Sequence, residues 1–291
     1  MSTNINFIKE IKKNKIHLKF LDKFSKSKVF VCKKNGILFH DDFKSSEEVV
    51  KLWSKNFKKK TNIKKGFYSG NNPGMKSRHV YCIEFLKQYF HNLKQKKICD
   101  FGAGEGGLLE FLFNIYKCKN VFAVEHSKEN CSYLKNLIPK IKTKNIINKS
   151  IENSVDKFKK QKIDIGILTW TLCNCSEPFE VIKSIKKILK PNGYLLIAES
   201  SRIMVPFKKS INNFFGSGKG YMHPWFFSFN SLNNMLISNG FELMAKNDYI
   251  NENDLVLLFK KSKKKKKVKV DSYKDVIKFM KDWVKYSKSV S

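Results

Sequence analysis

A glycine-rich stretch carries the clearest chemical signal in the sequence. It runs from Asp100 to Gly107, between a segment that predicts a strand and one that predicts a helix. Gly102, Gly104 and Gly107 match the pattern GxGxxG, in which glycines permit a tight turn and let a ligand approach the backbone and the first N–H groups of the helix. That pattern alone suits a dinucleotide equally well. Asp100 would repel a pyrophosphate and attract a cation, so the stretch favours a ligand that carries positive charge.

A second carboxylate ends the next predicted strand. Glu125 can accept hydrogen bonds from both hydroxyls of a ribose, but an acid at this place also fits a dinucleotide site.

The C-terminal part of the sequence distinguishes a dinucleotide-binding sheet from the alternative, a sheet that binds a cationic ligand. Two apolar strands are predicted at 241–245 and 254–259, with no room for a crossover helix between them. They must pair as an antiparallel hairpin, an ending that a plain dinucleotide-binding sheet lacks.

Strands and helices alternate along the middle of the chain. Such alternation predicts a mostly parallel sheet covered by helices on both faces. Strands are predicted at 97–101, 120–125, 144–148, 163–170 and 194–199, and helices at 46–57, 76–92, 108–116, 129–137 and 178–189.

Residues 96–260 resemble the class I S-adenosylmethionine-dependent methyltransferases. Asp100 to Gly107 is similar to the first motif of that family, Glu125 to its acidic second motif, and Thr169 to Leu172 to the end of its fourth strand. Leu189 to Leu195 is similar to its "LKPGG.L" turn, with Asn192 in place of a glycine. The resemblance implies an α/β fold: a doubly wound, seven-stranded, mostly parallel, Rossmann-like sheet with an antiparallel C-terminal hairpin. It also implies S-adenosyl-L-methionine as cofactor and methyl transfer as the activity.

The resemblance also implies a set of cofactor-binding residues. His126, beside Glu125, is expected at the edge of the cofactor, and Ser150 and Ile151 lie where the family contacts adenine. The expected set is Asp100, Gly102, Ala103, Gly104, Gly107, Glu125, His126, Ser150, Ile151 and Thr169.

Residues that could act on a methyl acceptor follow the fifth strand of the sheet. Methyl transfer needs an aligned acceptor and, for many acceptors, a base that removes a proton. His223 can take a proton near neutral pH, Tyr221 can hold an acceptor oxygen, and Glu199 is a comparable candidate. The alternative is that Pro224–Phe227 forms a hydrophobic lid and that His223 only caps the next helix.

The N-terminal segment carries a second, partial resemblance. Val31 to Phe39 is similar to half of a zinc ribbon, "CxxCGhxF", which precedes some sugar and small-molecule methyltransferases, although Asn35 replaces its second cysteine. No metal is therefore expected. In that family a Tyr-rich segment and an arginine follow, as Tyr68 and Arg78 do here; each is either structural or placed over the acceptor. The resemblance implies a nucleotide-linked sugar or glycan precursor as substrate, methylated at carbon or oxygen.

Composition and patterning predict three parts. Residues 1–65 form a small, degenerate zinc-ribbon-like segment, and 66–260 the S-adenosylmethionine-binding domain. Residues 261–291 form a lysine-rich linker and an amphipathic helix with apolar side chains at helical spacing. That helix is expected to dock on the body of the protein or on a partner or membrane.

The net charge of +33 does not by itself identify a binding partner. Nearly all of it is lysine spread along the chain, with arginine only at 78 and 202, so an AT-rich codon bias explains it as well as an anionic partner does. An RNA methyltransferase is the first alternative, although Thr171 to Cys175 lacks the [DNS]PP[YF] motif and the Pro-Cys pair of RNA-modifying enzymes. A non-catalytic cofactor-binding protein with its basic tail on anionic lipid is the second.

The predicted compartment is the cytoplasm. No stretch approaches the roughly 18–20 apolar residues that span a bilayer, and the first residues lack the pattern of a secretory signal. The seven cysteines, an odd number on apolar segments, indicate reduced thiols.

Overall fold

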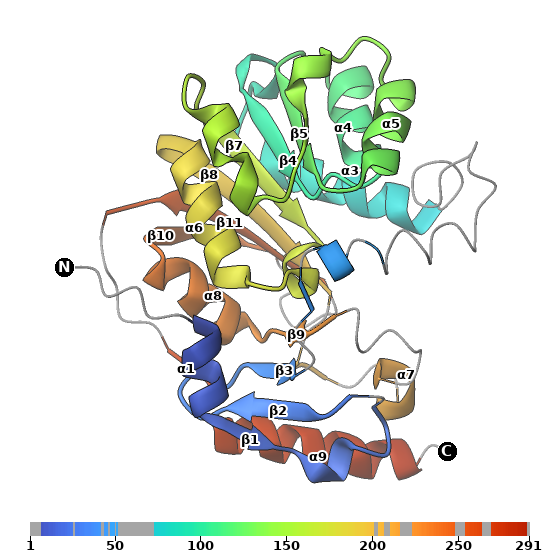
Figure 1. Cartoon of the computed structure of the whole chain (residues 1–291), viewed down its shortest axis with the longest axis vertical. Coiled ribbons are helices and arrows are strands. Elements are labelled where there is room, and N and C mark those ends of the chain that lie inside the picture. Colours follow the sequence, from blue (N-terminus) through green and yellow to red (C-terminus); the bar gives the residue numbers. More distant parts are fainter. Residues whose placement is uncertain are drawn as a thin grey trace.

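The computed structural model describes residues 7–25, 27–41, 44–45, 47–49, 51, 73–200, 203–206, 210–215, 223–247, 254–263 and 269–289. These residues build a seven-stranded sheet and a four-stranded sheet, one above the other in Figure 1. Tyr68, Tyr221 and most of the helix predicted at 46–57 lie outside this part of the chain.

The seven-stranded sheet has the order β10-β11-β8-β7-β4-β5-β6. Its strands are β4 (Ile98–Phe101), β5 (Val121–Glu125), β6 (Ile146–Asn148), β7 (Ile163–Thr169), β8 (Leu189–Glu199), β10 (Phe241–Lys246) and β11 (Leu255–Lys261). β11 pairs antiparallel with both β8 and β10, whereas the pairs among β8, β7, β4, β5 and β6 are parallel. The predicted doubly wound sheet with an antiparallel C-terminal hairpin is confirmed.

Helices cover both faces of this sheet because its strands are apolar on both sides (Figure 1). Ile165 and Ile167 of β7 face the layer of α3 (Pro73–Lys87), α4 (Gly107–Glu110) and α5 (Lys128–Leu137). Leu195 and Ile197 of β8 face α6 (Pro178–Ile188) and α8 (Phe229–Ser238). These side chains are fully buried, and each such burial stabilises the fold by about 1.5–3 kcal/mol.

The four-stranded sheet was not predicted as a unit. It joins β1 (Lys15–His17), β2 (Val29–Cys32), β3 (Leu38–His40) and β9 (Trp225–Phe226), all antiparallel, in that order. The predicted apolar runs of the N-terminal segment supply β2 and β3. Trp225 and Phe226, considered as part of a lid, are instead buried in β9, so the lid interpretation is wrong.

Each face of the small sheet has its own apolar cover. Phe30, Phe39 and Trp225 belong to the core that α6 and α8 share with the large sheet. The opposite face packs on α9 (Tyr273–Ser289) and α7 (Ile211–Phe215), and α9 lies along the outer side of the sheet in Figure 1. Val276, Met280 and Trp283 of α9 are buried there. Of the two docking sites expected for this helix, the body of the protein is the one the structure shows.

The hairpin of β2 and β3 lies in the stretch that resembles half a zinc ribbon. Its turn is closed by the Gly36 N–H, which donates to the Cys32 carbonyl at 3.0 Å, and by the Asn35 side chain, whose Oδ1 accepts from the Ile37 N–H at 3.1 Å. Within the described ranges no group of three or more His, Cys, Asp or Glu residues could hold a metal ion. The likeness to a zinc ribbon stays a prediction.

The remaining helices of the described residues are short. They are α1 (Phe7–Lys13) and the 3-10 helices η1 (Lys19–Leu21), η2 (Leu93–Gln95), η4 (Thr143–Asn145), η5 (Glu152–Phe158) and η6 (Leu172–Asn174). The helix predicted at 108–116 is divided into α4 and the π-helical turn η3 (Phe111–Ile115). None of the helices in the described residues is long and apolar enough to cross a membrane.

Candidate cofactor and acceptor site

The predicted site residues gather where the parallel strands end. Asp100 is the third residue of β4, Glu125 ends β5, Thr169 ends β7 and Glu199 ends β8. Since parallel strands have their carboxyl ends at one edge of a sheet, these four positions share that edge, where α/β folds bind ligands.

Glycines shape the loop that follows β4. Gly102, Gly104 and Gly106 have φ angles of +76°, +54° and +85°, which other residues rarely adopt. A Cβ on Gly102 would lie 2.5 Å from Thr171 Cγ2 and one on Gly106 would lie 2.6 Å from Leu134 Cγ, whereas a Cβ on Gly104 meets nothing within 4 Å. Gly102 and Gly106 are thus needed for packing, and Gly104 leaves open space over the loop. Gly106, which lies outside the GxGxxG match, has the positive φ and precedes the first residue of α4.

Glu125 fixes the loop from the neighbouring strand. Its Oε2 accepts the Gly104 N–H at 2.8 Å, and its Oε1 accepts the Ser127 N–H at 2.8 Å. Burial raises the pKa of this carboxyl group, and the two backbone donors oppose the rise. Each carboxylate oxygen has a second lone pair, so the group can also accept a ligand's hydroxyls.

Asp100 is a buried acid with an unsatisfied oxygen. Its side chain is 2% exposed, and Oδ1 has no hydrogen-bond partner among the described residues. Burial, assisted by the nearby Glu125, raises the pKa of Asp100 to about 7. A carboxylate in this position is costly unless an opposite charge accompanies it, so the site fits a cationic ligand.

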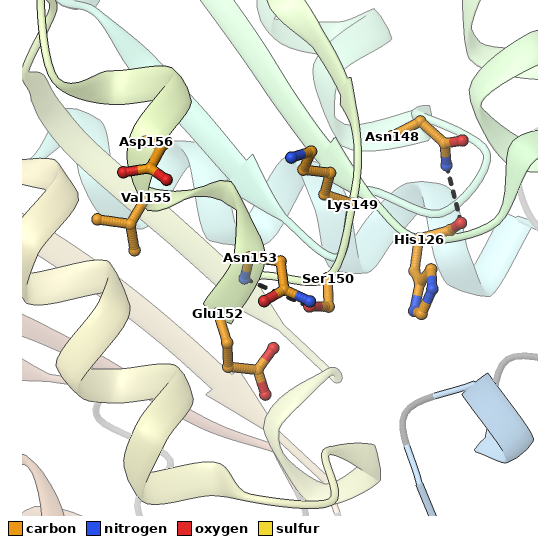
Figure 2. Close-up of a pocket in the computed structure, with 8 residues that line it drawn as sticks. All are labelled: His126, Asn148, Lys149, Ser150, Glu152, Asn153, Val155 and Asp156. Atoms are coloured by element: carbon orange, nitrogen blue, oxygen red, sulfur yellow. Dashed lines mark hydrogen bonds between the residues drawn. The ribbon is translucent and has the colours of Figure 1, made fainter.

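A polar pocket of about 650 Å³ opens beyond Glu125. Figure 2 shows its side chains, which come from the end of β6, from the loops after β5 and β6 and from η5: His126, Asn148, Lys149, Ser150, Glu152, Asn153, Val155 and Asp156. Asn148 joins the two loops, because its Nδ2 donates to the carbonyls of Glu125 at 3.0 Å and His126 at 2.8 Å. The pocket brings the predicted residues His126 and Ser150 together, while Ile151 is buried in the core next to them. Its position and size suit a heterocycle attached to a ribose held at Glu125.

A family model described as a methyltransferase domain matches residues 99–197. The matched span starts in β4 and ends in β8, so it includes the glycine loop, Glu125, the polar pocket and Thr169. The chain contains a class I S-adenosylmethionine-dependent methyltransferase domain. S-adenosylmethionine is the cofactor of this domain, and its positive charge suits the buried Asp100.

Solved structures share the fold of the methyltransferase domain. The 1,6-didemethyltoxoflavin-N1-methyltransferase of Burkholderia thailandensis is 11% identical, with a TM-score of 0.54, and the match covers 79% of this chain and 96% of that one. The N-methyltransferase NodS of Bradyrhizobium japonicum is 12% identical, with a TM-score of 0.52, over 73% and 98% of the two chains. The [4+2]-cyclase SpnF is 12% identical, with a TM-score of 0.57, over 75% and 96%. No curated protein matches the sequence.

At the same edge of the sheet, one segment links the glycine loop to His223. Trp170, directly after β7, has a φ of +51° and donates its N–H to the Ala198 carbonyl at 2.7 Å. Thr171 packs against Gly102. Asn174 Nδ2 donates to the Trp170 carbonyl at 3.0 Å, and Asn174 Oδ1 hydrogen-bonds His223 Nδ1.

Cys173 lies between the two acceptor-side candidates. Its Sγ is 3.6 Å from His223 Nδ1, and its N–H donates to Glu199 Oε1 at 3.3 Å. Glu199 is 1% exposed, and its Oε2 has no hydrogen-bond partner within the described residues. Burial raises the pKa of Glu199 to about 7, against the hydrogen bonds from Cys173 and Leu172. His223 and Glu199 therefore both contact Cys173, His223 through the side chain and Glu199 through the backbone N–H.

His223 does not cap the next helix. Ser228 is the N-cap of α8, where it forms a capping box with Ser231. The alternative interpretation of His223 as a cap is therefore wrong.

Arg78 of α3 contacts Trp170, the first residue of the segment from Trp170 to Asn174. Its guanidinium lies 5.3 Å from the centre of the Trp170 ring, and Nη2 is 3.8 Å from Asp254 Oδ1. The neighbouring His79 is 8% exposed; burial, with the charge of Arg78, lowers the pKa of His79 to about 4, so it is neutral at pH 7. Sequence reasoning considered Arg78 but missed His79, Trp170 and Asn174.

Proposed function

We propose that the protein transfers a methyl group from S-adenosylmethionine to an oxygen or nitrogen of a small molecule, with His223 as the general base. The observation that carries this proposal is the hydrogen-bonded segment from Trp170 to Asn174. It touches the cofactor loop through Thr171 and holds His223 through Asn174. A base is thereby tied to the same edge of the sheet as the cofactor-binding residues.

Each group has a defined part in this proposal. The cofactor, when bound, supplies an electrophilic methyl group. Asp100 balances its positive charge, and Glu125 together with Gly104 holds its ribose. His223 Nε2 removes the proton from the acceptor's O–H or N–H as the new bond to carbon forms, and later returns that proton to solvent. Glu199, beyond Cys173, favours the resulting imidazolium whenever its carboxyl group is ionised.

Similar folds support a small acceptor without fixing its identity. The Burkholderia protein is described with 1,6-didemethyltoxoflavin bound, and NodS is described as an N-methyltransferase. SpnF is described as a cyclase, so the fold by itself does not select a reaction. The chain's own base and buried acids are what favour proton removal and methyl transfer.

A narrower acceptor class is a nucleotide-linked sugar or glycan precursor. The similarity of Val31–Phe39 to a segment that precedes sugar methyltransferases supports it. The net charge of +33 suits an acceptor that carries a diphosphate. Tyr221, outside the described residues, is proposed to hold the acceptor oxygen.

We propose that the protein acts in the cytoplasm. All seven cysteines are reduced thiols in the fold, and six of them are buried, as expected in a reducing compartment.

The test has two stages. Calorimetry of the purified full chain should show binding of S-adenosylmethionine and S-adenosylhomocysteine, with NAD as the control that should not bind. Release of S-adenosylhomocysteine is then measured against a panel of nucleotide-sugars, small amines and phenols. Turnover with one of these classes supports the proposal. Cofactor binding with turnover only on RNA, or with co-purified RNA required for activity, would contradict it.

A further inference from the structure

Asn174 has only one consistent orientation of its side-chain amide. The Trp170 carbonyl can only accept a hydrogen bond, so the Asn174 atom 3.0 Å from it must be the donating Nδ2. Oδ1 of the same amide then faces His223. Because an amide oxygen can only accept, His223 Nδ1 must carry the hydrogen of that bond.

The protonation of Nδ1 determines what the other ring nitrogen can do. A neutral imidazole with its hydrogen on Nδ1 has its lone pair on Nε2, and Nε2 is then the atom that can accept a proton. The thiol of Cys173 agrees with this tautomer, since its Sγ lies 3.5 Å from Asn174 Oδ1, to which it can donate.

We propose that Asn174 is a positioning residue that holds His223 in the tautomer with its hydrogen on Nδ1 and so presents Nε2 to the methyl acceptor. This inference rests on the proposed role of His223 as the base.

The backbone anchors both sides of the pair. Trp170, whose carbonyl receives the Asn174 amide, is itself fixed to β8 through its N–H and the Ala198 carbonyl, 2.7 Å apart. One residue beyond Asn174, the Cys175 carbonyl accepts the indole N–H of Trp225 at 2.7 Å. Two hydrogen bonds therefore connect residues 174 and 175 to residues 223 and 225. Together they restrain the plane of the His223 ring as well as its tautomer.

The strained backbone of Trp170 is consistent with such a role. A non-glycine residue rarely adopts a φ of +51°, and this conformation persists only where the surroundings hold it. At Trp170 both peptide groups are held, the N–H by Ala198 and the carbonyl by Asn174.

The tautomer can be measured without knowing the acceptor. The ¹⁵N chemical shifts of the imidazole nitrogens are recorded for the full chain bound to S-adenosylhomocysteine, above the pH at which His223 is protonated. The chain has six histidines, and the spectrum of His223→Gln assigns the signal of interest. The wild-type protein should show the hydrogen of His223 on Nδ1. A wild-type signal with the hydrogen on Nε2 would overturn the proposal.

Two variants and one control separate positioning from folding. Asn174→Ala should move His223 toward the form with hydrogen on Nε2, whereas Asn174→Asp, whose side chain still accepts from Nδ1, should keep the wild-type tautomer. Asn239→Ala removes an amide that also donates to the carbonyl four residues earlier, Met235, at 2.8 Å, and should leave the His223 signal unchanged. An unchanged signal in Asn174→Ala overturns the proposal.

Turnover supplies the second readout once an acceptor is in hand. Asn174→Ala should lower kcat about tenfold or more with the KM for S-adenosylmethionine unchanged, and Asn174→Asp should restore most of it. Calorimetry on the same samples keeps the two hypotheses apart. Loss of cofactor binding in the wild-type protein contradicts the proposed function, whereas intact binding with the wrong tautomer contradicts only the role of Asn174.

Discussion

The Gly104 N–H and the Glu125 carboxylate lie 2.8 Å apart across the ends of two neighbouring strands. In the proposed site this contact gives Glu125 two roles, because the group that holds the glycine loop is also the one proposed to bind the ribose. Replacing it should therefore disturb binding more than the loss of one ligand contact would.

Glu125→Ala is expected to weaken binding of S-adenosylhomocysteine about 10- to 100-fold, since hydrogen bonds to a charged group contribute about 1.5–3 kcal/mol each. Isothermal titration calorimetry measures the effect. Asp282→Asn, on an exposed turn of α9, serves as a control that should bind as the wild type does. Unchanged affinity in Glu125→Ala would show that the ribose is not bound at this position.

Asp100→Asn should abolish most cofactor binding and stabilise the ligand-free protein at neutral pH. The pKa of Asp100 rises from 3.8 to about 7 on folding. The folded state therefore holds more protons than the unfolded chain between about pH 4 and 7, and stability falls as the pH rises through that window. Thermal melts from pH 4 to 8 should show a shallower decline in the variant. The part that remains is expected from Glu199 and Glu125, whose pKa values are also raised by burial.

Affinity for the cofactor should increase with pH over the same range. A cationic ligand favours the ionised form of Asp100, so binding below about pH 7 has to displace a proton. Calorimetry in two buffers of different ionisation enthalpy would reveal proton release at pH 6 and less of it at pH 8. Binding that is independent of pH from 5.5 to 8 would contradict the placement of positive charge at Asp100.

His223→Gln should lower turnover by a factor of about 10²–10⁴ with cofactor affinity unchanged, as expected for loss of a general base. His91→Gln, at an exposed position before η2, is the matched control. If both variants turn over acceptor at the wild-type rate, His223 is not the base.

Trp283→Ala should cost about 3–5 kcal/mol in the free energy of unfolding, because it leaves a cavity beneath α9. Trp283 is 4% exposed, and its ring centre lies 4.6 Å from that of Phe214. Tyr286 on the same helix is 38% exposed, so Tyr286→Ala should change stability little. Chemical denaturation of both variants tests whether α9 belongs to the folded body.

The parts of the site that sequence could predict are those encoded within short stretches. Asp100 and the glycine loop, Glu125 at the end of its strand, and the hairpin of β10 and β11 each have a local pattern. Gly106 shows the limit of such patterns: it lies outside the GxGxxG match but has a positive φ, which a match of residue spacing does not reveal.

Other parts depend on contacts between distant residues. Asn174 lies between two cysteines, and its neighbours in the sequence do not indicate that its partner is His223, 49 residues away. Trp225 and Phe226 form a strand only because β3, nearly two hundred residues earlier, is there to pair with them. Local sequence patterns contain no information about such pairings.

The small sheet also has a consequence for synthesis on the ribosome. Its strand β9, two residues after His223, needs β3 from the start of the chain and is covered by α9 near the end. The strands of the large sheet are complete once β11 has emerged, but the apolar surface that α9 covers stays exposed until the last described residues leave the exit tunnel. The cofactor half of the site can therefore form before the acceptor half is secured, and a chain that stops short of α9 would retain the glycine loop while leaving the support of His223 without its apolar cover.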